Sequence, residues 1–252
     1  MKNQDPSQEY LQSIINLFTQ GQLQLALSEV IQMLERFPNS VVLYNIAGAC
    51  NAGLMEFDAA IINYKQALKI KPDYAQAYYN MGIALYEKGD LERAIESYKQ
   101  ALKIKPDYAQ AYNNIGIALY DKGDLEAAIE SCKQALKIKP DYAQAYNNIG
   151  NTLKEKGNLD AAISSYKQAI KIKPDYAEGY SNLGDVFQLL NQTEQAIVSY
   201  EKAISLKNDL NTAISGLGIT LLKKGEHIKG LDKLRQGDGS ILFNIKSGLS
   251  IK

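Results

Sequence analysis

Apolar side chains along this chain follow the spacing of amphipathic helices, which come in pairs. Residues 75–89 place their apolar side chains at intervals of three and four, which puts them on one face of an α-helix. Residues 90–106 show the same spacing, so a second helix is expected there. The apolar positions are Tyr78, Met81, Gly82 and Leu85 in the first stretch, and Leu91, Ala94, Ile95, Tyr98, Ala101 and Leu102 in the second.

Glycine, aspartate and proline mark where these helices begin and end. Gly89 interrupts the apolar pattern between the two stretches, and Asp90 is suited to cap the second helix. Pro106 ends that helix, because proline disfavours helical geometry at the residue before it. Asp107 and Gln110 have the spacing of a capping box, which predicts the start of a further helix. The sequence therefore predicts a helical hairpin.

The hairpin pattern recurs with a period of 34 residues. Five prolines are separated by that interval, and a fixed period of this length is typical of repeat proteins. Each hairpin can bury its apolar faces only against a neighbour, so the repeats are expected to stack into one continuous core. The prolines are Pro38, Pro72, Pro106, Pro140 and Pro174.

The period divides the chain into three parts. Residues 1–6 are an N-terminal extension, residues 7–244 are the repeat array, and residues 238–252 are a tail that overlaps the last unit. Gly230 and Gly237 stand in the last unit where other units carry alanine. Since glycine costs a helix about 1 kcal/mol relative to alanine, the last unit is expected to be degenerate and its second helix short. The units are 7–40, 41–74, 75–108, 109–142, 143–176, 177–210 and 211–244.

The repeat resembles that of the tetratricopeptide repeat (TPR) family, whose signature combines a Leu-Gly pair with aromatic, alanine and proline residues at fixed places. The resemblance covers residues 7–244 and is most specific in the five middle units. It implies an all-α fold, a right-handed α-solenoid (superhelix) of about seven helix-turn-helix units. In unit 143–176 the signature residues are Tyr146, Ile149, Gly150, Leu153, Gly157, Ala162, Tyr166, Ala169 and Pro174.

The same resemblance implies a non-catalytic protein–protein interaction scaffold. In TPR arrays the first helices of successive hairpins line a concave groove, where an extended peptide or partner segment binds. Positions 2, 5, 6, 9, 12 and 13 of each unit face this groove in the family, and their spacing defines one helical face. The candidate peptide-binding residues at such positions are Asn80, Asn114, Asn148, Asn182, Asn113, Asn147, Gln110, Gln144, Tyr79, Tyr86 and Tyr120.

The recurrence of asparagine in helix centres needs a physical reason, since asparagine is a mediocre helix former. One interpretation is that each amide offers a donor and an acceptor to a peptide backbone. This pattern resembles the asparagine ladder in the TPR arm of O-GlcNAc transferases. The other interpretation is that the amides bond to neighbouring helices. Four hydrogen bonds of about 1 kcal/mol each give only millimolar affinity, so a weak, backbone-directed binder is expected.

Net charge and hydropathy narrow the choice of partners. Lysine plus arginine and aspartate plus glutamate each number 28, whereas binding to nucleic acid phosphates requires an excess of positive charge. We therefore expect no nucleic-acid partner. No apolar run reaches the roughly 20 residues of a membrane span, and the first residues lack the pattern of a secretory signal. A cytoplasmic protein that does not contact a membrane is expected.

Candidate catalytic residues are few. His227 is the one histidine and stands where other units carry leucine. Cys50 and Cys132 stand where other units carry a small or aromatic core residue, which favours packing over redox chemistry. The sequence contains no phosphate-binding loop, no dinucleotide-binding glycine pattern and no zinc-type spacing. We therefore expect no enzyme activity, no cofactor and no metal site.

Two other functions remain as alternatives. The array could be the substrate-recruiting arm of a larger multidomain enzyme, for example a glycosyltransferase. It could also be an RNA-binding helical repeat, because lysines recur along the second helices, as at Lys65, Lys69 and Lys71. Acidic residues between those lysines and the period of 34 residues both argue against the RNA-binding alternative.

The tail shows a different pattern from the repeats. Ile241, Phe243 and Ile245 alternate with other residues, which is more typical of a strand than of a helix. Because this segment is apolar, we expect it to fold over the last unit, to pair with another copy of the chain, or to be the beginning of a further domain. Self-association through residues 238–252 is therefore one of the expected interactions.

Overall fold

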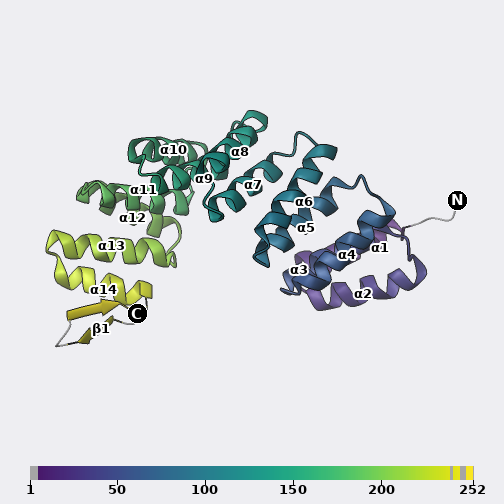
Figure 1. The fold of residues 1–252 in the computed structure, drawn as a ribbon. Helices are drawn as coiled ribbons and strands as arrows, with labels where there is room; N and C mark the ends of the chain where they lie inside the picture. The colour runs from purple at the N-terminus through teal and green to yellow at the C-terminus, as the bar shows by residue number, and fades with distance from the viewer. Residues whose placement is uncertain (1–4, 239–240, 245–247, 252) are drawn as a thin grey trace. The chain divides into compact units, whose positions relative to one another are not determined.

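The structure, a computed structural model, describes residues 5–238, 241–244 and 248–251. It divides into two compact parts, an N-terminal part at Met1–Ile138 and a C-terminal part at Lys139–Lys252. In the N-terminal part, pairs of helices form four helical hairpins (Figure 1). Their bounds are α1 Gln8–Thr19, α2 Leu23–Arg36, α3 Val41–Gly53, α4 Phe57–Ile70, α5 Ala75–Glu87, α6 Leu91–Ile104, α7 Ala109–Asp121 and α8 Leu125–Ile138.

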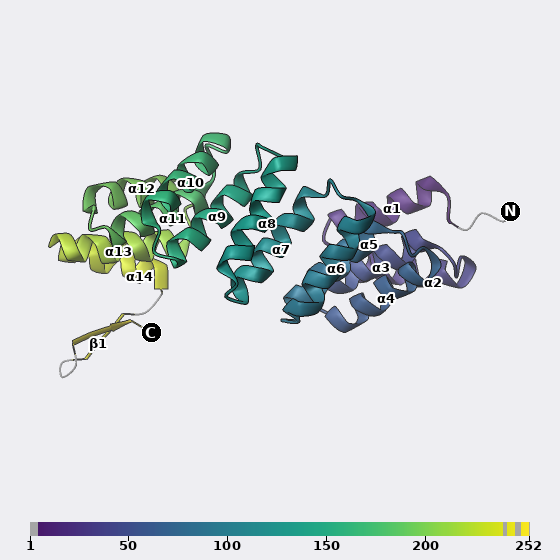
Figure 2. The same ribbon diagram turned by 45° about the horizontal axis from the view of Figure 1, so that its top comes forward.

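The C-terminal part contains three more helical hairpins and a two-stranded β-hairpin, whose ribbon follows α14 (Figure 2). The strands pair antiparallel, with Ile241 opposite Ile251 and Asn244 opposite Gly248. The bounds are α9 Ala143–Glu155, α10 Leu159–Ile172, α11 Ala177–Leu189, α12 Thr193–Leu206, α13 Asn211–Lys224, α14 His227–Asp238, β1 Ile241–Asn244 and β2 Gly248–Ile251.

The prediction of seven all-α helical hairpins is confirmed over residues 8–238, whereas residues 241–244, the end of the predicted array, form a strand. Apolar side chains of both helices in each hairpin form its core, as the helical spacing predicted. The strands β1 and β2 lie in the tail, at residues 241–244 and 248–251. Across the described ranges, every helix falls short of the combination of length and hydrophobicity that a membrane span requires.

A residue in the left-handed conformation joins the two helices of each hairpin. Gly89 fills this place between α5 and α6 with a φ of 84°. A positive φ costs most residues about 1–2 kcal/mol, whereas glycine adopts it freely. Met55 and Asn191 hold the equivalent place in two hairpins, with φ values of 63° and 56°. Asparagine tolerates this conformation better than methionine, so the turn at Met55 carries the greater backbone strain.

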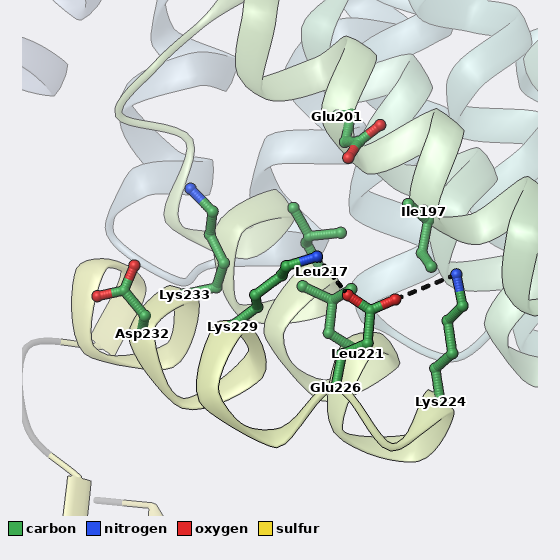
Figure 3. A pocket seen from close by; sticks show the side chains of 9 residues that line it. All are labelled: Ile197, Glu201, Leu217, Leu221, Lys224, Glu226, Lys229, Asp232 and Lys233. Atoms are coloured by element: carbon green, nitrogen blue, oxygen red, sulfur yellow. Dashed lines mark hydrogen bonds and ion pairs between the residues drawn. The ribbon is translucent and has the colours of Figure 1, made fainter.

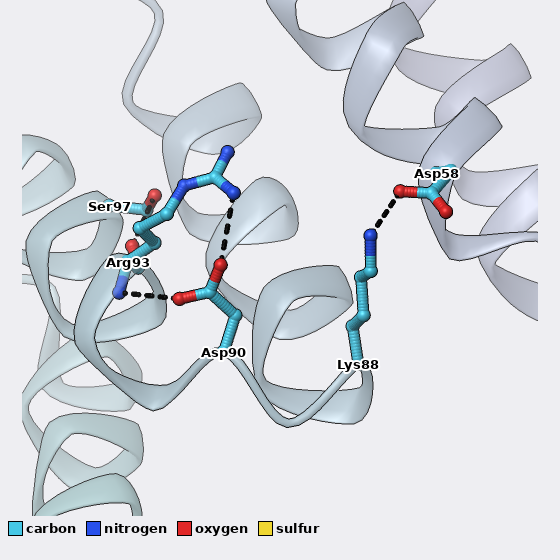
Figure 4. Close-up of polar contacts among 5 residues, drawn as sticks. All are labelled: Asp58, Lys88, Asp90, Arg93 and Ser97. Carbon is cyan, nitrogen blue, oxygen red and sulfur yellow. Dashed lines mark hydrogen bonds and ion pairs between the residues drawn. The ribbon is translucent and has the colours of Figure 1, made fainter.

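Of the two helix caps predicted at Asp90 and at Asp107, only the first is present. Asp90 caps α6, and its side chain accepts a hydrogen bond from the Arg93 backbone N–H at 3.2 Å (Figure 4). The capping box predicted at Asp107 and Gln110 is wrong, because the N-cap of α7 is Tyr108, whose side chain makes no capping bond. Asp107 therefore stands one residue too early to bond to the free N–H groups of the first turn.

In every hairpin except α1–α2, a side chain of the second helix packs against a glycine of the first helix. A Cβ atom on Gly82 would lie 2.5 Å from the Tyr98 ring, and one on Gly150 would lie 2.6 Å from the Tyr166 ring. Both tyrosines are buried, so any side chain larger than glycine would displace a packed ring. Cys132 takes the place of the tyrosine in the hairpin α7–α8 and is also buried.

Ion pairs connect neighbouring hairpins at one end of the first helices. A lysine at the end of the first helix, or in the turn after it, reaches an acidic residue in the first turn of the preceding second helix, as Figure 4 shows for Lys88. Such exposed pairs contribute about 0.2–1 kcal/mol each, so they add only modestly to the stability of the chain. The pairs are Lys88–Asp58, Lys122–Glu92 at 2.5 Å and Lys224–Glu194 at 3.2 Å.

The last helix, α14, differs from the other second helices. It has 12 residues, whereas α12 has 14. Gly230 lets α14 approach α13 closely, since a Cβ atom there would lie 2.8 Å from the Leu222 side chain. Ile228 stands where other second helices carry the acidic residue of the ion pairs, and its side chain is 87% exposed.

Candidate functional site

The first helix of each hairpin carries amide side chains on one face. We call the face formed by α3, α5 and α7 the N-terminal amide face, and that formed by α9, α11 and α13 the C-terminal amide face. On both faces an asparagine of one first helix donates to a side chain of the previous first helix, 35 residues earlier. The second interpretation of the asparagines, bonding to neighbouring helices, therefore describes part of what they do.

A chain of hydrogen bonds crosses the N-terminal amide face from α7 to α3. The Tyr108 hydroxyl, at the start of α7, donates to Gln76 Oε1 at 2.9 Å. Gln76 Nε2 donates to Asn80 Oδ1 at 2.8 Å, and Asn80 Nδ2 donates to Asn45 Oδ1 at 3.1 Å. Three successive first helices are thus connected by side chains alone, with the sixth residue of α5 at the centre.

Asn114 lies one helix further along this face, beside a cluster of aromatic rings. Its Nδ2 donates to the Tyr79 hydroxyl at 3.3 Å. The Tyr79 ring packs against Tyr108, with centroids 4.6 Å apart, and against Tyr98, with centroids 5.8 Å apart. Burial raises the pKa of Tyr108 to about 12, and neighbouring Tyr79 adds to the rise. Tyr79 therefore supports the face from within the cluster, and part of the ring area predicted to stack on a ligand is already covered.

Tyr86 and Tyr120 occupy the same place near the ends of α5 and α7. The Tyr86 hydroxyl donates to Asp121 Oδ2 at 2.5 Å, which connects α5 to α7. Burial is the main reason that the pKa of Tyr86 lies above its usual range, and the hydrogen bond to the Asp121 carboxylate raises it further. Both rings are half-buried, so each keeps part of its surface exposed on the amide face.

A pocket of about 210 Å³ opens on the N-terminal amide face between α5 and α7. Two isoleucines and the ring of Tyr98, which is only 1% exposed, form its apolar surface. Asn114, Tyr86 and Glu87 add polar atoms. Sequence reasoning named Asn114 and Tyr86 but missed the others. The lining residues are Ile83, Tyr86, Glu87, Tyr98, Asn114 and Ile117.

The C-terminal amide face repeats the asparagine contact but fills the equivalent space with polar groups. Asn182 Nδ2 donates to Asn147 Oδ1 at 2.9 Å, which connects α11 to α9. Asn148 is half-buried and is also bonded. Further along, Ser181 and Thr212 lie with their hydroxyl oxygens 3.5 Å apart, between α11 and α13.

The tyrosines of the second helices reach this face with their hydroxyls. Tyr166 donates to Asn151 Oδ1 at 2.8 Å, and Tyr200 donates to Asp185 Oδ1 at the same distance. Asp185 also pairs with Lys154 Nζ at 3.4 Å. Burial, together with the Asp185 carboxylate, raises the pKa of Tyr200 far above its usual range. The polar residues at the ninth place of α9 and α11 thus bond directly to the tyrosine beneath them.

Two of the predicted site residues are buried. Asn113 is 4% exposed and Asn147 is 5% exposed, because the fifth residue of these helices lies against a neighbouring helix. A buried amide of this kind bonds to other groups of the protein: Asn147 Oδ1 accepts a hydrogen bond from Asn182. Gln110 and Gln144, by contrast, are exposed at the second residue of their helices. The periodicity of a single helix indicates which residues share a face, but it does not show which of them are exposed and which pack against a neighbouring helix.

The recurring lysines are engaged with the chain itself at the joints between hairpins. In each of four joints the lysine before the proline lies over the ring of the tyrosine three residues later. Such a cation–π contact at an exposed site contributes about 0.5–1 kcal/mol. This offers a structural role for one lysine in each repeat. The pairs are Lys71–Tyr74, Lys105–Tyr108, Lys139–Tyr142 and Lys173–Tyr176.

The histidine and cysteines lie away from the amide faces. His227 is exposed at the start of α14. Burial raises the pKa of Cys50 to about 11 and that of Cys132 to about 12, which disfavours the reactive thiolate. Among the residues that the structure describes, no three His, Cys, Asp or Glu side chains gather closely enough to hold a metal ion.

A second pocket, of about 320 Å³, lies among α12, α13 and α14 (Figure 3). Ile197, Leu217 and Leu221 form its apolar part, and charged side chains surround them. Glu226 sits between two lysines in Figure 3, pairing with Lys224 at 3.3 Å and with Lys229 at 2.8 Å. The rim charges therefore largely neutralise one another, and nothing in this pocket selects a ligand of one charge.

Comparison with protein families identifies the repeat. A family model described as TPR repeat matches residues 56–89, 83–123, 116–157 and 150–191, which together span more than half of the chain. A second model, described as tetratricopeptide repeat, matches residues 177–210. A sequence search of curated proteins gave no match.

Solved structures show the same fold. MamA is 28% identical, with a TM-score of 0.57, over 64% of this chain and 94% of MamA. Cut9–Hcn1 of the APC/C is 16% identical with a TM-score of 0.75, and this chain spans 47% of that chain's length. YrrB, described as a TPR protein with an unusual peptide-binding site, is 21% identical over 73% of this chain and 95% of YrrB, with a TM-score of 0.55. The likeness to Cut9–Hcn1 and YrrB concerns the fold alone.

Proposed function

This chain belongs to the tetratricopeptide repeat family, and we propose that it is a non-catalytic scaffold that binds an extended segment of a protein partner on its amide faces. Members of this family generally mediate protein–protein interactions. The arrangement of amides on the first helices carries the proposal. A cytoplasmic location, the lack of a nucleic-acid partner and self-association of the tail stay predictions from the sequence.

The amides keep hydrogen-bonding capacity after their contacts within the protein. A side-chain amide has two N–H donors and an oxygen with two lone pairs. Asn80 uses one donor towards Asn45 and one lone pair towards Gln76, so one of each is left. Gln110 presents an exposed amide on α7, and Gln144 presents one on α9. Donors and acceptors of this kind match the alternating C=O and N–H groups of an extended backbone.

The internal hydrogen bonds also prepare the amides for binding. Asn114 is held by the Tyr79 hydroxyl, and Asn182 by Asn147. A side chain that is already ordered loses less rotamer freedom when a ligand binds, which would otherwise cost about 0.5–1.5 kcal/mol for each such side chain. YrrB offers an analogy at the level of the fold, because it is described as having a peptide-binding site.

The proposal is tested by replacing amides and measuring peptide binding. Peptides that bind the wild-type chain are first selected from an array of unstructured sequences and then measured by calorimetry. The variants Asn114→Ala and Asn148→Ala should each weaken binding about fivefold, since a net hydrogen bond contributes about 1 kcal/mol. The loss should be similar for peptides of different sequence, because the contact is to the backbone.

The matched control is Asn63→Ala. Asn63 lies on the second helix α4, where its Nδ2 donates to the Ala59 carbonyl at 3.1 Å, away from the amide faces. This variant should bind peptides as the wild type does, and circular dichroism should show that all three variants are folded. Unchanged affinity of Asn114→Ala and Asn148→Ala, or an array without binders, would rule out the proposed function.

A further inference from the structure

We propose that the pocket between α5 and α7 receives an apolar side chain of the bound segment, and that Glu87 and Asp121 select a lysine or arginine next to it. This inference rests on the proposed function and specifies the chemistry of the ligand. The occupant is thus a stretch of a partner protein in which an apolar residue and a basic residue are neighbours.

The apolar half of the inference follows from the surface of the pocket. Ile83 and Ile117 stand at the ninth place of α5 and α7, and Tyr98 of α6 lines the same pocket. The pocket of about 210 Å³ is large enough to remove a branched side chain from water, which favours binding in proportion to the apolar area covered. Asn114 lines the same pocket, so its amide is placed beside the backbone of a residue bound there.

The C-terminal amide face carries different side chains at the place of the two isoleucines. At the ninth place of α9 and α11 stand Asn151 and Asp185, which accept the tyrosine hydroxyls beneath them. The repeat therefore does not require isoleucine at this place. Its presence on both α5 and α7 is what leaves apolar surface open over Tyr98.

The basic half of the inference follows from charge. Glu87 is exposed on the pocket rim, and among the described residues it forms no ion pair. Asp121 is exposed at the end of α7 and accepts the Tyr86 hydroxyl. None of the groove positions of α3, α5 and α7 carries lysine or arginine. Lys88 and Lys122 follow directly in sequence but pair with Asp58 and Glu92 of the second helices.

These carboxylates therefore leave an uncompensated negative charge beside an apolar surface. A basic residue of the ligand gains a favourable interaction there, and an acidic residue meets like charge. Both carboxylates are exposed, so the preference is expected to weaken as the salt concentration rises.

The test compares labelled extended peptides that differ only at two central residues. Fluorescence anisotropy is measured for peptides with Leu-Lys, Leu-Glu and Ser-Lys at the centre. The wild type should bind Leu-Lys about tenfold more tightly than Ser-Lys, because serine leaves the pocket unfilled. It should also bind Leu-Lys several-fold more tightly than Leu-Glu at low salt.

Two variants assign these preferences to the pocket. Glu87→Gln should reduce the preference for Leu-Lys over Leu-Glu, and Ile83→Ala should reduce the preference for Leu-Lys over Ser-Lys. Glu35→Gln, which removes an exposed carboxylate of α2, is the matched control and should change neither preference. Glu87 is exposed, so its replacement tests the charge effect without loss of core packing.

The outcomes separate this inference from the proposed function. Equal binding of the three peptides, or preferences that Glu87→Gln and Ile83→Ala leave unchanged, would overturn the inference while amide-dependent peptide binding stands. If neither these peptides nor the array gives any binding, the proposed function and the inference both fail.

Discussion

The amide faces at α5–α7 and at α9–α11 share their asparagines but differ at the ninth residue of each first helix. Ile83 and Ile117 leave an apolar pocket over Tyr98, whereas Asn151 and Asp185 bond to the tyrosine hydroxyls beneath them. The first helices of these hairpins have the same length, although Cys132 replaces the tyrosine in α7–α8 and Asn191 replaces the turn glycine in α11–α12. One side chain in each repeat therefore changes the chemistry of the face while the scaffold stays the same.

Both faces have a buried tyrosine beneath them. The stability of the folded chain at alkaline pH tests the effect of burying these hydroxyls. Burial raises the pKa of Tyr98 and of Tyr200 above the ordinary value of 10.0, with Asp185 adding to the rise at Tyr200. Below pH of about 10 the folded and unfolded chains are both protonated, so this contribution to stability is complete. Above it the unfolded chain loses protons that the folded chain keeps, and each tyrosine costs about 1.4 kcal/mol of stability at a pH of about 11.

Thermal unfolding followed by circular dichroism measures this effect. The unfolding temperature should stay constant from neutral pH to a pH of about 9, where the buried cysteines begin to contribute, and should fall steeply above a pH of about 10. Because several such groups act together, this is the largest effect expected. A profile without that fall would mean that the tyrosines ionise as easily in the folded chain as in the unfolded one.

Removing one tyrosine hydroxyl from beneath each face tests whether the two hydroxyls contribute differently to stability. Tyr200→Phe loses a hydrogen bond to the Asp185 carboxylate, and bonds to charged groups contribute about 1.5–3 kcal/mol. Tyr98→Phe should cost less than about 1 kcal/mol, because the surface over Tyr98 is largely apolar and Asn114 is the polar group beside it. Urea unfolding of the two variants gives both values. Equal losses would show that the ninth residue does not determine how the tyrosine is held.

The smallest expected effect concerns the hairpin turns of the two parts. Met55 and Asn191 hold positive φ values where other hairpins have glycine. Met55→Gly should raise stability by about 1 kcal/mol, since the backbone strain is relieved and the methionine side chain is 75% exposed. Asn191→Gly should gain less, because asparagine tolerates this conformation. Thermal melts would compare them, and a loss of stability in Met55→Gly would show that its side chain contributes more than its strain costs.

The sequence predicts the hairpins well because each repeat contains all the signals for its own helices. Gly89, Asp90 and Pro106 act within a few residues of where they stand: α5 ends at Glu87, just before Gly89, and α6 lies between Asp90 and Pro106. The start of α7 was predicted less well. Asp107 is a residue type that often caps helices, but after the turn that follows Pro106 the N-cap of α7 is Tyr108.

The chemistry of the amide faces is harder to predict because it depends on contacts between repeats. Asn113 and Asn114 were both predicted to face the groove although consecutive residues are about 100° apart around a helix, and the structure buries one while the other lines the pocket. The pocket itself needs Ile83 of α5, Tyr98 of α6 and Ile117 of α7 at once. A comparison of the ninth place across repeats would have indicated the contrast between isoleucine and polar residues, but not the space it leaves.

The attachment of α5 to its neighbours has a mechanical consequence. Its first turns are connected through the amides of Gln76 and Asn80, and the residue after its end is connected through the ion pair of Lys88. Dissolved salt screens the exposed ion pair but leaves the neutral amide bonds almost unchanged. Rising ionic strength should therefore weaken the ion pair at one end of the helix more than the amide bonds at the other end. The expected response is a change in helix tilt, so that the width of the face would vary along its length while the fold remains intact.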